Sequence, residues 1–153
     1  MKRKLKFRVA IPAFALLVVL MFPFSYIHEL GHASVCASEG NTFDITIDLN
    51  GGHIVCHDTV NNHTLYTMMG GLLAMSIAAL PFIFYNKIKK YSFVVIAFAV
   101  LAIGHGINAG IETIFYETYM QDAVLWGMIM GLFAFLMFIG LATRYAKKEV
   151  SAC

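Results

Sequence analysis

Charged residues are scarce in this chain, and four long stretches contain none at all. Only 13% of the 153 residues are charged, whereas 59% are hydrophobic; an average soluble domain carries about 25% charged residues. This balance excludes an ordinary soluble domain. The uncharged stretches cover residues 9–27, 65–85, 91–111 and 123–143. A helix needs about 20 apolar residues to cross a bilayer, so the sequence predicts an all-α membrane protein with four transmembrane helices.

Cysteine is rare as well. The spacing of Cys36, Cys56 and Cys153 matches no known zinc or disulfide framework. Whether Cys36 and Cys56 form a disulfide stays open at this point. Internal repeats, low-complexity tracts and flexible linkers are also missing, and we therefore expect a single integral-membrane domain over residues 1–153.

Basic residues occur in only three segments, which are residues 2–8, 87–90 and 144–148. With four spans, all three segments fall on one side of the membrane. Short loops rich in Lys and Arg stay on the cytoplasmic side, so we expect a multi-pass protein of the cell membrane with both termini in the cytoplasm. A basic start followed by an apolar run also suits a secretory signal peptide, but no convincing cleavage site precedes residue 28 and three further spans follow.

A short β-hairpin is expected between the first two spans, at about residues 42–58. Apolar residues alternate with polar ones from Phe43 to Leu49 and are followed by Asn50-Gly51-Gly52, a pattern typical of a strand and a turn. An irregular polar loop is the alternative. The first span should continue to about residue 37, because Gly40 favours the conformation that ends helices. The spans are then about 9–37, 65–85, 91–114 and 123–143.

The first span ends in the pattern His28-Glu29-Leu30-Gly31-His32. Residues four apart lie on one face of a helix, so His28 and His32 can bind one metal ion together. Zinc binds imidazole nitrogen readily and lowers the pKa of a bound water to about 7. Glu29 can then act as the general base and afterwards as the general acid. The simpler alternative is two buried histidines, but it leaves a costly carboxylate in an apolar helix.

A third metal ligand is expected from the third span, which carries His105, Asn108 and Glu112. At about 1.5 Å of rise per residue, His28 lies about 28 Å along its span and Glu112 about 31 Å, against about 21 Å for His105. Glu112 is therefore the predicted third ligand, with His105 as the alternative. His105 and Asn108 are otherwise expected to support the ligands or to bind substrate.

Three segments together resemble the core of the site-two proteases, which are intramembrane zinc metalloproteases. They are HELGHA, the strand with its Gly-Gly pair (GNTFDITIDLNGGHIV) and the small-residue span MMGGLLAMSIAALPF, within residues 20–85. The resemblance implies a zinc metalloendopeptidase that hydrolyses peptide bonds in or near transmembrane segments. It assigns His28 and His32 as ligands of one zinc ion and Glu29 as the catalytic residue. The hairpin would offer an edge strand to an unwound substrate.

One part of the family pattern is missing, because the chain lacks the Asn-Pro-type motif whose aspartate supplies the third ligand. This departure keeps a second hypothesis open, a non-proteolytic metal-binding subunit of a larger membrane complex. Heat-shock membrane proteases, with a glutamate as third ligand, are a weaker match because the hairpin does not suit them. The expected partners are a membrane-protein substrate and the lipid bilayer; an oligomer or larger complex stays open, and no nucleic acid is expected.

Overall fold

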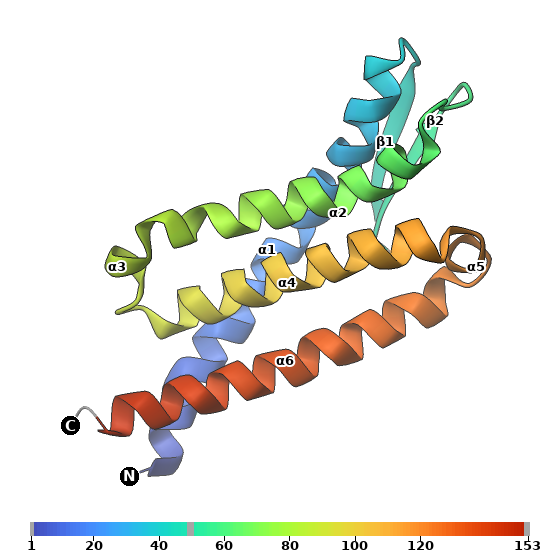
Figure 1. Cartoon of the computed structure of the whole chain (residues 1–153). Coiled ribbons are helices and arrows are strands. Elements are labelled where there is room, and N and C mark those ends of the chain that lie inside the picture. Colours follow the sequence, from blue (N-terminus) through green and yellow to red (C-terminus); the bar gives the residue numbers. More distant parts are fainter. Residues whose placement is uncertain (1, 49–50, 152–153) are drawn as a thin grey trace.

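Four long apolar helices, one β-hairpin and three short helical segments make up the part of the chain that the structure describes. The computed structural model describes residues 2–48 and 51–151 (Figure 1). Its elements are α1 (Lys2–Ser38), β1 (Phe43–Asp48), β2 (Gly51–Cys56), α2 (His63–Ala79), the 3₁₀ helix η1 (Leu80–Phe84), α3 (Tyr85–Ile88), α4 (Ser92–Ile114), α5 (Tyr116–Gln121) and α6 (Ala123–Ser151). Four segments are long and apolar enough to cross a membrane: Phe7–Ser38, His63–Ile88, Ser92–Ile114 and Val124–Ala146. The predicted fold class is confirmed, and the chain is a membrane protein.

Helix α1 ends where the sequence predicted. Gly40 adopts a positive φ of 83°, and its backbone N–H donates to the carbonyl of Ala37. A residue with a side chain rarely adopts this conformation, so the glycine stops the helix and turns the chain back. Helix α2 ends at Ala79, and Pro81 lies in η1, since proline cannot continue the hydrogen-bond ladder of an α-helix.

The hairpin runs back beside the last turns of α1 (Figure 1). Strands β1 and β2 are antiparallel, from Phe43 opposite Cys56 to Asp48 opposite Gly51. The hairpin is confirmed, but the prediction that Gly51 and Gly52 form its turn is wrong, because both lie in β2. The remaining turn residue, Asn50, lies outside the described residues. Instead, Gly52 allows β2 to approach α1 closely, which is a common role of glycine within a strand.

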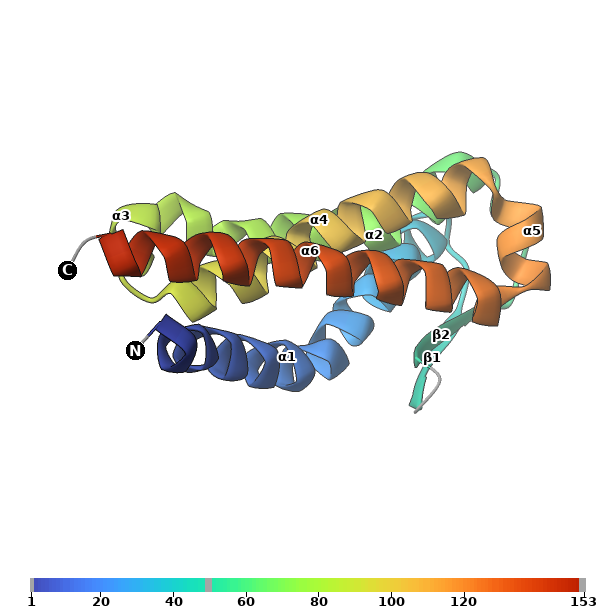
Figure 2. The same ribbon diagram turned by 90° about the horizontal axis from the view of Figure 1, so that it is seen from below.

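Helices α2 and α4 lie side by side, with α1 crossing them and α6 against α4 and α1 (Figures 1 and 2). Small residues make the α2–α4 approach close: a Cβ added to Gly71 would lie 2.5 Å from the His105 carbonyl oxygen. Close approach of helices is the usual role of small residues in membrane spans. Two apolar clusters fill the bundle. One consists of Phe24, Ala74, Ala78 and Leu101, and the other of Val9, Ala13, Ile96, Val100, Phe138 and Ala142.

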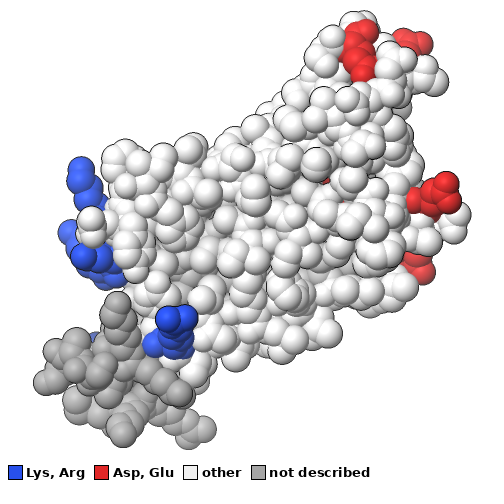
Figure 3. All heavy atoms as spheres, in the orientation of Figure 1, with Lys and Arg blue, Asp and Glu red and all other residues white. Residues whose placement is uncertain are grey.

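Charged side chains gather at the two ends of the bundle (Figure 3). We call one the basic end, which holds Arg8, Lys87, Lys89, Lys90 and Arg144, and the other the acidic end, which holds Glu39, Asp44, Asp48, Asp58, Glu117 and Asp122. Both chain termini lie toward the basic end (Figure 1). The hairpin and α5 belong to the acidic end.

Candidate metal centre

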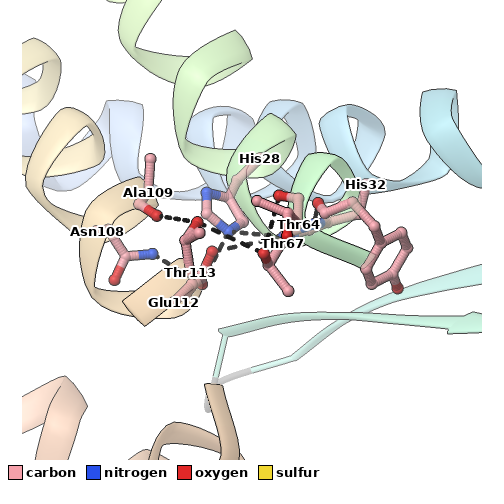
Figure 4. A network of polar contacts seen from close by, with 9 residues as sticks. His28, His32, Thr64, Thr67, Asn108, Ala109, Glu112 and Thr113 are labelled. Carbon is pink, nitrogen blue, oxygen red and sulfur yellow. Dashed lines mark hydrogen bonds and ion pairs between the residues drawn. The ribbon is translucent and has the colours of Figure 1, made fainter. Parts of the chain in front are cut away.

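Three buried side chains meet between α1 and α4. His28 and His32 lie one turn apart on α1, and Glu112 comes from the last turn of α4 (Figure 4). His28 Nε2 lies 3.1 Å from His32 Nε2 and 3.2 Å from Glu112 Oε1, and His32 Nε2 lies 3.7 Å from Glu112 Oε2. One potential ligand atom from each residue falls within 4.8 Å of the other two. The group could therefore hold a metal ion.

Helix α2 fixes the orientation of His32. Nδ1 of the ring lies 2.6 Å from the backbone carbonyl oxygen of Tyr66. Because a carbonyl oxygen can only accept, Nδ1 must carry the proton, and in the neutral ring Nε2 keeps its lone pair for a metal. A Cβ on Gly70 would collide with His32 Nε2. The glycine thus allows α2 to pass directly over the ligand atom.

Asn108 holds Glu112 from the preceding turn of α4. Its side-chain amide donates to Glu112 Oε1 over 2.8 Å, while Oε2 lies on the side of His32. Helices α2 and α4 are also joined nearby by the hydroxyls of Thr67 and Thr113, which lie 3.4 Å apart (Figure 4). Such outer partners orient metal ligands and are typical of metal sites.

Two buried atoms at the centre have no hydrogen-bond partner within the part of the chain that the structure describes, Glu112 Oε2 and His28 Nδ1. A buried polar atom without a partner costs about 1–3 kcal/mol. Bound to a cation, Glu112 Oε2 would no longer be unpaired. Two imidazoles and one carboxylate form a donor set found in catalytic zinc sites, so the residues present fit a divalent metal ion.

Glu29 lies beside the group and under the hairpin. It follows His28 on α1, and only 7% of its surface is exposed. A Cβ added to Gly52 would lie 2.6 Å from Glu29 Cγ and 2.8 Å from Glu29 Oε1. The backbone of β2 therefore packs directly over the carboxylate. A side chain at residue 52 would overlap the Glu29 carboxylate, so the glycine is needed for this contact.

His105, the alternative third ligand, lies outside the cluster of ligand atoms that the described residues form. Its ring stacks on Phe24 with 5.9 Å between the centroids and lies 5.6 Å from the ring of His28. His105 is thus a neighbour of one ligand, on the side that faces the apolar interior. Asn108, its companion in the sequence prediction, contacts Glu112 directly.

The hairpin and the loop that follows it are fastened to the end of α1 at the acidic end. A disulfide joins Cys36 of α1 to Cys56 of β2, which answers the question that the sequence left open. The carboxylate of Glu39 accepts hydrogen bonds from the backbone N–H groups of Asn61 and Asn62. These bonds lower the pKa of Glu39 below its usual range, because they favour the ionised form.

Three contributors to the centre were missed in the sequence. Tyr66 acts through its backbone carbonyl, which no side-chain pattern can indicate. Gly52 was assigned to a turn, although a glycine within a strand pattern is itself a signal of close backbone approach. Tyr119 of α5 carries a phenol whose pKa is raised first by burial and then by the nearby Glu112 carboxylate. It lies beyond the end of the span, where the periodicity of α4 gives no information.

Comparisons with known proteins add no relative to this picture. No protein-family model, no curated protein and no solved structure matches the chain.

Proposed function

We propose that the protein is an intramembrane zinc metalloprotease, similar to the site-two proteases, that hydrolyses peptide bonds in or near transmembrane segments. The observation that carries the proposal is the convergence of His28, His32 and Glu112 within 4.8 Å, with Glu29 next to the first ligand. A glutamate adjacent to a histidine ligand is the arrangement that a hydrolytic zinc site uses.

In this proposal His28, His32 and Glu112 hold one zinc ion. Zinc, when bound, would act as a Lewis acid that makes a water molecule acidic near neutral pH and polarises the substrate carbonyl. Glu29 accepts the proton of the attacking water and passes it to the departing amine, which makes it general base and then general acid. Asn108 and the Tyr66 carbonyl hold two of the ligands in position, through Glu112 and His32.

Burial suits this chemistry. Each of the four central residues, His28, Glu29, His32 and Glu112, is 7% exposed. In so dry a site, charge interactions are stronger than in water. The substrate must enter unwound, since a helical peptide hides its carbonyl groups in internal hydrogen bonds.

For the orientation, we propose that the basic end faces the cytoplasm. Positively charged loops remain on that side, and the described Lys and Arg side chains gather at the basic end (Figure 3). The Cys36–Cys56 disulfide lies at the acidic end, and disulfides persist in oxidising compartments outside the cytosol. Two independent features thus favour the same orientation.

The test is a comparison of wild type with Glu29→Gln, purified in detergent or lipid. We expect about one equivalent of zinc in both proteins and cleavage of a single-span membrane substrate by the wild type alone. The substitution keeps the shape of residue 29 but removes its basicity. Zinc retained by the wild type without cleavage of a broad substrate panel would refute the protease and leave a metal-binding subunit of a larger membrane complex.

A further inference from the structure

We propose, on the basis of the protease function above, that this enzyme cuts its substrates at the non-cytoplasmic boundary of the membrane, where the acidic end lies. We call this the outer boundary. The substrate class is then membrane proteins whose cleavable bond lies within one or two helical turns of that boundary. The outer part of such a substrate leaves on the non-cytoplasmic side, and its span stays in the membrane.

The position of the centre along the helices is the first argument. Glu112 lies two residues before Ile114, the end of α4, which is about 3 Å of helix. Tyr66, which supports His32, lies three residues after the start of α2 at His63, or about 5 Å. Helix α4 has 23 residues, about 35 Å, against about 30 Å for the hydrocarbon core. The ligands therefore lie at the membrane boundary of the acidic end and not in the middle of the bilayer.

The hairpin gives a second, independent argument. Gly52 contacts Glu29, and its neighbour Gly51 pairs with Asp48. The side chain of Asp48 is 55% exposed. Neither an exposed carboxylate nor an open sheet edge is tolerated in hydrocarbon. The strand that covers Glu29 must thus lie where water is present, which places Glu29 at the boundary as well.

The interior below the centre gives the third argument. On the side toward the basic end, the ring of His105 stacks on Phe24, and Phe24 belongs to the apolar cluster with Ala74, Ala78 and Leu101. The second apolar cluster follows nearer the basic end. An unwound peptide from that end would have to pass both layers without partners for its backbone groups. Approach from the outer boundary avoids this cost.

The first experiment uses the full chain in lipid vesicles and three single-span substrates. The substrates are identical except that a helix-breaking Gly-Gly pair lies at the outer boundary, in the middle or at the inner boundary of the span. Mass spectrometry of the fragments locates the cut, and Glu29→Gln is the control for each substrate. We expect the outer-boundary substrate to be cut at least tenfold faster than the other two, with the cut beside its Gly-Gly pair.

The second experiment reads the position of the metal without using activity. Zinc-loaded protein in right-side-out and in inverted membrane vesicles is exposed to EDTA, a chelator that does not cross the bilayer. We expect faster zinc loss from right-side-out vesicles. Equal loss from both preparations, including no loss from either, overturns the placement, as does faster loss from inverted vesicles.

The two experiments separate the inference from the function on which it rests. A cut in the middle or at the inner boundary that depends on Glu29 overturns the inference and leaves the protease intact. If none of the substrates is cut, the proposed function falls and the assigned cleavage position falls with it. The vesicle measurement still decides in that case whether the metal centre lies at the outer boundary.

Discussion

Replacing Gly52 with alanine should abolish most of the activity and leave the metal in place. The added Cβ would lie 2.6 Å from Glu29 Cγ, 2.8 Å from Oε1 and 3.0 Å from Cδ. Ordinary contacts between such atoms are about 3.5–4.0 Å, so the carboxylate must move by about 1 Å. A displacement of this size can cost about 100-fold in rate, or about 2.7 kcal/mol of transition-state stabilisation.

The assay is kcat/KM on a membrane substrate, together with zinc content and thermal unfolding. Zinc should remain at one equivalent, because the three atoms nearest to the added methyl all belong to Glu29. The unfolding temperature should change little, since the group that gives way is the flexible side chain of Glu29. Gly110→Ala is the matched control: a Cβ there meets nothing within 4 Å, and we expect wild-type kinetics. Full activity of Gly52→Ala at full zinc occupancy would refute the role of Glu29 in this geometry.

Three further predictions concern the ligands and the loop after β2. Glu112→Ala should lose most of its zinc, whereas His105→Ala keeps about one equivalent. Asn108→Ala should weaken zinc binding by about 10–100-fold, the usual cost of losing an outer partner. Metal analysis after dialysis against graded chelator ranks the three variants, and a larger loss for His105→Ala than for Glu112→Ala would exchange the roles of His105 and Glu112. Gly70→Ala should also reduce zinc binding, because its methyl would occupy the place of His32 Nε2. The same dialysis measures the zinc affinity of this variant, and an unchanged affinity would contradict the close approach of α2 to His32. The pKa of Glu39 is lowered in the folded protein, so its contribution to holding the loop is complete above its ordinary pKa of 4.5 and is lost as the pH falls through the lower folded value. Amide exchange, corrected for intrinsic rates, should show acid-induced loosening of the loop in wild type and no such pH dependence in Glu39→Gln. Equal pH dependence in both proteins would show that the Glu39 carboxylate does not hold the loop.

The helices and the cluster of His28, His32 and Glu112 could be predicted because both depend on local rules. Uncharged runs and the segregation of basic residues determine how often a chain crosses a bilayer. Helical spacing brings His28 and His32 together. Counting the rise per residue placed Glu112 at the same depth in the membrane as these histidines, and placed His105 two turns of helix away from Glu112. A membrane fixes helix starts to within a few residues, which is why a depth count is informative here.

Asn108, which contacts Glu112, was expected from the sequence to support the site, because it lies one turn away on the same helix. The partners that come from other elements could not be predicted, because they depend on how elements pack. The hydrogen bond to His32 comes from a backbone carbonyl, which every residue has. The pairing of Cys36 with Cys56 depends on where the hairpin returns along α1, and that direction is set by the turn at Gly40. The hairpin register decided the role of Gly52. Each of these features requires three-dimensional contacts between segments far apart in the sequence.

The disulfide has a consequence for the register of the hairpin. Side chains in a strand alternate between two faces, and Cys56 and Gly52 are four residues apart, so both face α1. A shift of one residue would turn both away at once, and the Cys36–Cys56 bond forbids such a shift. Cross-linking one end of β2 thus sets the alignment at the other end, where the strand meets Glu29. Single-residue deletions between 52 and 56 should therefore be far more harmful than substitutions of Val55, which faces away.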